Sequence, residues 1–112
     1  MTLIALVDDL LFQSKIRQTV GPLGVEVHFV KTPAEADAKW SDPAVAVVDL
    51  HLAGTEPLAA IRVLRANHPA ASIIAYGSHV EADLLAQARA AGCTTVLPRS
   101  AFIQHLGQLL SS

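Results

Sequence analysis

The sequence has few charged residues, few aromatic residues and one cysteine. Lys, Arg, Asp and Glu make up 16% of the chain, against about 25% in an average soluble domain. The basic residues are scattered and the formal net charge is -2, so we expect binding to neither nucleic acid nor an anionic membrane surface. A single cysteine, Cys93, excludes an internal disulfide and a cysteine-built metal site. This favours a reducing compartment, with the cytoplasm as the expected location.

Long apolar runs are also absent. The first apolar run, residues 3–7, has no basic segment before it and ends at Asp8 and Asp9. The sequence therefore predicts neither a signal peptide nor a membrane span. A length of 112 residues fits one domain, which we expect to span residues 1–112.

Short apolar runs alternate with helical stretches along the chain. The runs are apolar at consecutive positions, which is typical of parallel strands that are buried on both faces. The alternation predicts an α/β fold in which helices lie on both faces of a five-stranded parallel sheet. We expect the strands near residues 3–7, 25–30, 44–48, 72–76 and 94–97.

Capping residues mark the helix boundaries. Residues 32–35, Thr-Pro-Ala-Glu, form a capping box that predicts the start of the second helix, which we expect to end near Trp40. Ser78 and Glu81 repeat this spacing, so Ser78 is predicted to cap the fourth helix, which Gly92 ends. The other helices have comparable signals: Asp9 or Leu10 to Gly21 for the first, Thr55 and Glu56 to Pro69 for the third, and Ser100 as the cap of the last.

Acidic residues directly follow two of the expected strands. Asp8 and Asp9 come after the first strand, and Asp49 comes after the third. If these strands are parallel neighbours, the carboxylates meet at the carboxyl edge of the sheet, where open α/β folds place their sites. Because Mg²⁺ prefers oxygen ligands, carboxylates in this place are a candidate site for Mg²⁺ and phosphoryl chemistry.

These residues give the chain a resemblance to a known family. Over almost its whole length it resembles the receiver domain of bacterial two-component response regulators. The resemblance rests on the Asp8-Asp9 pair, on Asp49, and on residues 90–92, Ala-Ala-Gly, seven residues before Arg99. It implies the flavodoxin-like receiver fold, with strand order 2-1-3-4-5.

The resemblance also implies roles for particular residues. Asp49 becomes the candidate phosphoacceptor, which attacks the phosphoryl group of a phosphohistidine donor. A Mg²⁺ ion would be held by Asp8, Asp9, Asp49 and the backbone carbonyl of His51. The implied partners are proteins: a histidine kinase or phosphotransfer protein, and a downstream effector. A homodimer through the fourth helix, the fifth strand and the fifth helix is a further expectation, since the last helix carries apolar residues over more than one face.

The chain departs from the family pattern at several positions, among them Ala53 and Pro57, where the family usually has proline and glycine. Gly77 stands where the family has a Thr or Ser that contacts the phosphoryl oxygen, and Arg99 stands where it has a lysine. Arginine keeps the charge, but its planar fork is unlike a point ammonium. Val96 stands at the position of the family's switch aromatic. These departures indicate an atypical receiver with a degraded phosphorylation site.

Simpler structural roles stay open for the same residues. Asp49 could cap a turn at the end of its strand, and Asp9 could be a helix N-cap. Arg99 could neutralise the acidic cluster in the absence of metal and phosphate.

The sequence therefore leaves two hypotheses about function. The first is a stand-alone receiver-like domain in phosphorelay signalling, which acts through Asp49 and through protein partners. The alternative is a phosphorylation-independent pseudo-receiver that acts only as an interaction module. An enzyme such as a small aspartyl-phosphate phosphatase is not expected, because His51 rather than a second acid lies two residues after Asp49.

Overall fold

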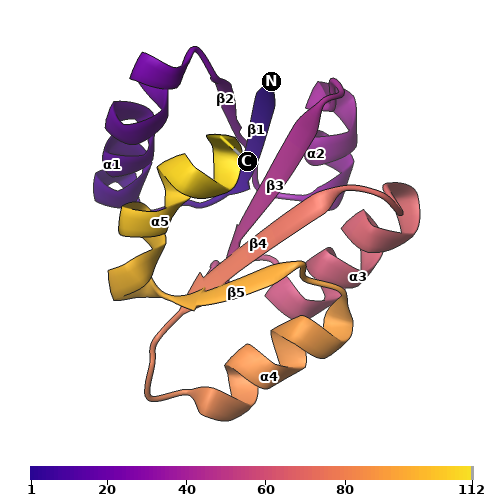
Figure 1. The fold of residues 1–112 in the computed structure, drawn as a ribbon. Helices are drawn as coiled ribbons and strands as arrows, with labels where there is room; N and C mark the ends of the chain where they lie inside the picture. Colours follow the sequence, from indigo (N-terminus) through magenta and orange to yellow (C-terminus); the bar gives the residue numbers. More distant parts are fainter. Residues whose placement is uncertain (112) are drawn as a thin grey trace.

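The computed structural model describes residues 1–111 of the chain. In this range strands alternate with α-helices, and a 3₁₀ turn, η1, follows α1 (Figure 1). The elements are β1 (Thr2–Leu6), α1 (Leu10–Val20), η1 (Gly21–Leu23), β2 (Glu26–Phe29), α2 (Pro33–Lys39), β3 (Ala44–Asp49), α3 (Pro57–Asn67), β4 (Ser72–Gly77), α4 (Ala82–Ala91), β5 (Thr95–Pro98) and α5 (Arg99–Ser111).

The strands form one sheet in the order β2-β1-β3-β4-β5, and every neighbouring pair is parallel. The predicted α/β class and strand order are confirmed. In Figure 1, α1 and α5 lie on one side of the sheet, and α2, α3 and α4 lie on the other. Because Leu6 of β1 pairs with Val48 of β3, the loops that follow these two strands lie at the same edge.

The sheet separates two apolar layers, since side chains alternate between its faces along each strand. On one face, Leu3, Val47 and Tyr76 pack with Phe12 of α1 and Phe102 of α5. The alternate residues of the same strands pack against α2, α3 and α4. Burial on both faces is the reason why the strand sequences are apolar at consecutive positions.

Three helix starts agree with the sequence. At the start of α1, the Asp9 carboxylate accepts a hydrogen bond from the backbone N–H of Phe12 at 3.1 Å. At the start of α2, the Thr32 hydroxyl oxygen accepts one from the backbone N–H of Glu35 at 3.1 Å. The Glu56 carboxylate accepts one from a backbone N–H in the first turn of α3 at 2.6 Å. The first of these bonds confirms the helix-cap interpretation of Asp9.

The predicted cap of the fourth helix is wrong. α4 begins at Ala82, with Glu81 in the N-cap position. The Ser78 hydroxyl oxygen accepts a hydrogen bond from the backbone N–H of Val80 at 3.4 Å instead. Residues 78–81 are therefore a loop rather than the first turn of the helix.

The last helix starts earlier than the sequence predicts. α5 begins at Arg99, directly after Pro98, so Ser100 lies in its first turn and is not its cap. Among the large apolar side chains of α5, Phe102, Leu106 and Leu110 are buried, whereas Ile103 and Leu109 are partly exposed. Large exposed apolar side chains of the described range are Met1, Leu10, Leu11, Leu23, Val63 and Val80.

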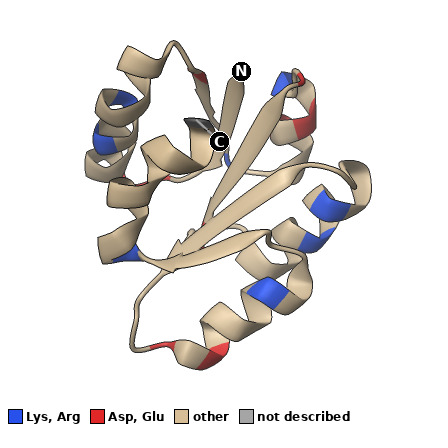
Figure 2. Ribbon diagram, in the orientation of Figure 1, with Lys and Arg blue, Asp and Glu red and all other residues tan. Residues whose placement is uncertain are grey.

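Charged residues are spread over the helices and loops of the fold, as Figure 2 shows. Basic residues occur on α1, α2, α3, α4 and α5 rather than on one face. Within residues 1–111, no helix is long and apolar enough to cross a membrane.

Candidate functional site

Asp49 lies at the carboxyl end of β3 and is 4% exposed. Its Oδ1 accepts a hydrogen bond from the backbone N–H of His51 at 2.8 Å. The same oxygen lies 4.0 Å from a guanidinium nitrogen of Arg99, whose side chain is half exposed. The first contact is the local turn cap of the simpler interpretation, and the second places a compensating cation on the solvent side of a buried carboxylate.

Asp8 and Asp9 lie at the same edge, in the loop between β1 and α1. The Asp8 Oδ2 accepts a hydrogen bond from the backbone N–H of Ala53 at 3.2 Å, which joins this loop to the loop that follows Asp49. Asp9 caps its own helix instead. The structure therefore brings Asp8 and Asp49 to connected loops, whereas Asp9 stabilises the start of α1.

The three carboxylates do not form a ready-made ligand cluster. Within residues 1–111, no three His, Cys, Asp or Glu side chains gather closely enough to hold a metal ion. Each of Asp8, Asp9 and Asp49 accepts a hydrogen bond from a backbone N–H in this conformation. The donor set still fits Mg²⁺ chemically, since carboxylate and carbonyl oxygens are its preferred ligands.

Gly77 ends β4 in closely packed apolar surroundings. A Cβ at this position would lie 3.2 Å from Cδ1 of Leu50 and 3.4 Å from Cδ2 of Leu85. Leu50 is itself buried, and Val96 is buried in the same apolar layer. The space that a Thr or Ser side chain would enter is therefore lined by apolar atoms.

Tyr76 is a neighbour of Asp49 that the sequence interpretation missed. β3 and β4 pair Asp49 with Tyr76, so both side chains lie on the face that α1 and α5 cover. The Tyr76 ring lies against Phe12 and Phe102, with ring centroids 4.7 and 4.6 Å apart. Burial, and next the charge of Asp49, strongly raise the pKa of Tyr76. The two-residue period of the sequence puts 47 with 49 on one face of β3 and 74 with 76 on one face of β4, but only the strand register makes these faces the same.

His51 has a contact that the sequence did not indicate. Its Nε2 lies 2.7 Å from Oε1 of Glu81, and both side chains are partly exposed. This contact joins the loop after β3 to the start of α4. Together with the bond between Asp8 and Ala53, it ties the loops after β1, β3 and β4 to one another.

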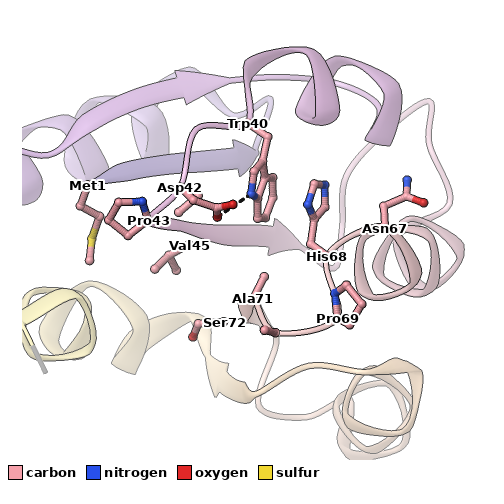
Figure 3. A pocket seen from close by; sticks show the side chains of 12 residues that line it. Met1, Trp40, Asp42, Pro43, Val45, Asn67, His68, Pro69, Ala71 and Ser72 are labelled. Atoms are coloured by element: carbon pink, nitrogen blue, oxygen red, sulfur yellow. Dashed lines mark hydrogen bonds between the residues drawn. The ribbon is translucent and has the colours of Figure 1, made fainter.

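Two hollows lie at opposite edges of the sheet. One of about 760 Å³ lies between the starts of α1 and α5, where Asp9, Lys15 and Arg99 are among its lining residues. The other, of about 570 Å³, lies at the far edge (Figure 3). There the Trp40 ring stacks on His68 with centroids 3.6 Å apart. Trp40 thus covers an edge of the sheet far from the acidic residues.

Solved structures of receiver domains match the fold of this chain. NtrX from Brucella abortus superposes with a TM-score of 0.82 at 16% identity, over 98% of this chain and 25% of that chain. A CheY-like response regulator receiver domain protein from Methanospirillum hungatei superposes with a TM-score of 0.82 at 17% identity, over 98% of this chain and 90% of that one. The BeF3-activated DrrB receiver domain gives 0.82 at 14% identity, over 98% and 93%.

No protein-family profile and no curated protein matches the sequence. The similarities are therefore similarities of fold: the chain has the receiver fold that its acidic residues and strand pattern implied. It spans a quarter of the NtrX chain and nine-tenths or more of the other two.

Proposed function

We propose that this chain is a receiver-like signalling domain in which Asp49 accepts a phosphoryl group and protein partners read the result. The observation that carries the proposal is the place of Asp49, a buried carboxylate at the carboxyl edge of the sheet with Arg99 at 4.0 Å. In this proposal residues 1–112 form one domain of a cytoplasmic phosphorelay. The domain acts as a signalling module rather than as an enzyme.

The proposed reaction is transfer of a phosphoryl group from a phosphohistidine of a partner protein. A carboxylate oxygen of Asp49 attacks phosphorus, the P–N bond breaks, and its electron pair stays on the imidazole nitrogen. The product on this chain is an acyl phosphate. Arg99 is suited to stabilise the added negative charge, because its guanidinium already lies on the solvent side of this carboxylate.

Mg²⁺ would be held by Asp8, Asp9, Asp49 and the backbone carbonyl of His51, which are the oxygen donors of this edge. The ion would supply positive charge next to the transferred group. Asp9 already serves as the N-cap of α1. We therefore expect metal binding and the stability of the first turn of α1 to be coupled.

The proposed partners are a histidine kinase or phosphotransfer protein, which donates the phosphoryl group, and a downstream effector. Large apolar side chains are exposed beside the site: Leu10 at 79%, Leu11 at 68% and Val80 at 75%. They lie at the ends of the loops after β1 and β4, so a protein that reaches Asp49 would cover them. A homodimer through α4, β5 and α5 stays a separate prediction.

A phosphorylation-independent interaction module is the second candidate, and the packing around Gly77 favours it. Leu50 and Leu85 fill the space next to this position, and Val96 is buried. A switch hydroxyl and a mobile aromatic residue therefore have no counterpart on this face of the sheet. In this candidate function, Asp49 serves only as the turn cap.

Exposure to Mg²⁺ and acetyl phosphate, followed by intact-mass measurement, separates the two candidates. A mass increase of one phosphoryl group in the wild type, and none in Asp49→Asn, supports the phosphoacceptor. We expect Arg99→Ala to slow the modification by at least about tenfold, while Arg99→Lys retains most of it. An unmodified wild-type protein at high acetyl phosphate concentration would overturn the phosphoacceptor role and leave the interaction module.

A further inference from the structure

We propose that the Tyr76 hydroxyl is the hydrogen-bond donor to the Asp49 side chain, and that its ring couples this side chain to α1 and α5. The proposal deepens the role given to Asp49 and rests on the proposed function only for its last test. In this proposal Tyr76 positions the Asp49 carboxylate. The neighbouring Gly77, which stands at the family's Thr or Ser position, has no side chain that could do so.

The strand register brings the two side chains together. Asp49 pairs with Tyr76 across adjacent parallel strands, which lie about 4.8 Å apart. Two residues earlier on each strand, Val47 and Ile74 are also paired, and both pack in the same apolar layer. Because paired residues of parallel strands point to the same face, the phenol and the carboxylate share the layer between the sheet and the helices α1 and α5.

The Tyr76 hydroxyl needs an acceptor. Tyr76 is 1% exposed, and its hydroxyl has no hydrogen-bond partner among residues 1–111. A buried hydroxyl without a partner is costly, and most buried polar groups in folded proteins are paired. A small movement of the Tyr76 side chain that gives its hydroxyl an acceptor would therefore lower the free energy of the folded protein.

Asp49 is the acceptor that the strand register places beside Tyr76. After burial, the charge of Asp49 is the next cause that raises the pKa of Tyr76, and Arg99 lowers it. Oδ1 of Asp49 accepts the hydrogen bond from His51, which leaves the second oxygen for the phenol. Burial keeps the phenol protonated by raising the pKa of Tyr76, so it remains a donor at neutral pH.

The Tyr76 ring connects this hydrogen bond to two helices. It lies between Phe12 of α1 and Phe102 of α5, with centroid distances of 4.7 and 4.6 Å, and these two rings are 5.8 Å apart. A shift of the phenol oxygen is therefore transmitted to the contact between α1 and α5. The opposite face of β4, at Gly77, presents only apolar neighbours.

A double-mutant cycle tests the hydrogen bond in the unmodified protein. The variants are Tyr76→Phe, Asp49→Ala and the combination, compared by urea unfolding. We expect a coupling of about fivefold or more in the unfolding equilibrium constant, because Tyr76→Phe destabilises only while Asp49 is present. If Tyr76→Phe has the same effect in both backgrounds, the proposal is wrong.

The matched control removes another hydroxyl at the opposite end of the sheet. Thr94 accepts a hydrogen bond from the backbone N–H of Ile73 at 3.1 Å, several residues away from the site. Thr94→Val should destabilise the protein equally with and without Asp49, since distant sites add. Coupling of the same size in this control would show that Asp49→Ala perturbs the sheet as a whole, and the hydrogen bond would lose its support.

A spectroscopic test does not depend on stability. The chain has one tyrosine, so 3-fluorotyrosine labelling gives a single ¹⁹F resonance from position 76. We expect Asp49→Asn to shift this resonance, and the control Asp37→Asn, at the far edge, to leave it in place. We also expect Asp49→Asn to shift amide resonances of Phe12 and Phe102, and this effect should vanish in the Tyr76→Phe background. An unshifted ¹⁹F resonance in Asp49→Asn would overturn the proposal.

Addition of Mg²⁺ and beryllofluoride separates this inference from the phosphoacceptor function. If the wild type binds beryllofluoride, the ¹⁹F resonance should move with saturation, and Tyr76→Phe should weaken the binding by roughly tenfold. If beryllofluoride binds without moving the ¹⁹F resonance, and Tyr76→Phe binds it with wild-type affinity, the positioning role is wrong. If the wild type does not bind it, the phosphoacceptor function fails, while the cycle and the Asp49→Asn spectrum still decide the hydrogen bond.

Discussion

The imidazole of His51 and the carboxylate of Glu81 meet at 2.7 Å, and this contact changes how α4 begins. The spacing of Ser78 and Glu81 is that of a capping box, in which the glutamate bonds back to the serine's own N–H. Glu81 instead reaches across to the loop after β3, and α4 starts at Ala82, three residues later than a cap at Ser78 would start it. The contact between Glu81 and His51 therefore takes the place of the local capping bond between Glu81 and Ser78.

Removal of this contact should loosen the loop without unfolding the protein. We expect Glu81→Ala to raise amide hydrogen exchange in residues 78–81 severalfold. Both side chains are partly exposed, so the free energy of unfolding should fall by less than about 1 kcal/mol. The matched control is Glu26→Ala, which removes the exposed partner of His28 at 3.5 Å. Unchanged exchange in residues 78–81 would mean that the contact does not hold the loop.

The two functions of Asp9 can be separated by a pair of substitutions. Asp9→Asn keeps an N-cap oxygen and removes the charge, whereas Asp9→Ala removes both. We expect Asp9→Ala to lower the free energy of unfolding by about 1 kcal/mol, and Asp9→Asn to lower it by much less. Mg²⁺ titration followed by amide shifts should show weaker binding in both variants if Asp9 is a ligand. Binding of Mg²⁺ at wild-type affinity in Asp9→Asn would leave Asp9 with the helix cap alone.

Arg65 is expected to be the most important basic residue for stability. Its guanidinium donates hydrogen bonds to the carbonyl of Gly92 at 3.0 and 2.8 Å and to that of Ala71 at 2.7 Å. It thereby joins the end of α3 to the turns before β4 and β5. Arg65→Met should lower the free energy of unfolding by about 2 kcal/mol or more, because these carbonyls lose their donor. Arg62→Met, on the exposed side of the same helix, should change it by less than about 0.5 kcal/mol in the same urea titration.

Cys93 is expected to be a poorly reactive thiol. Burial raises its pKa from 9.0 to about 11, with Arg65 opposing the shift. Iodoacetamide at pH 8 should therefore alkylate the folded protein roughly a hundredfold more slowly than the urea-unfolded protein. Similar rates in the two states would show that the thiol is not protected by the fold.

The same shift predicts how stability depends on pH. Between about pH 9 and 11 the unfolded thiol is ionised while the folded thiol keeps its proton. Unfolding then releases a proton. The contribution of Cys93 to the free energy of unfolding is therefore complete below about pH 9 and declines as the pH rises toward 11. The decline should be smaller in Cys93→Ser, and urea titrations across this pH range measure it.

Local chemistry made much of the fold predictable. Consecutive apolar residues announced strands buried on both faces, and Asp9, Thr32 and Gly92 marked helix ends through hydrogen bonds or turns within a few residues of themselves. The place of Asp49 at the end of β3 followed from the same pattern. These features depend on contacts between residues that are close in the chain, so they can be predicted from the sequence.

The features that the sequence did not disclose depend on partners far along the chain. Glu81, which would complete a capping box with Ser78, contacts His51 instead. The Asp8 carboxylate accepts a hydrogen bond from the backbone N–H of Ala53, 45 residues away in the chain. The neighbour of Asp49 is Tyr76, which only the pairing of β3 with β4 brings to its side.

The sequence by itself thus determined the α/β class, most helix ends and the edge of the sheet at which Asp8, Asp9 and Asp49 lie. Tertiary structure decided the partners from distant segments, Ala53 for Asp8 and Tyr76 for Asp49, because only the packed chain brings these segments side by side.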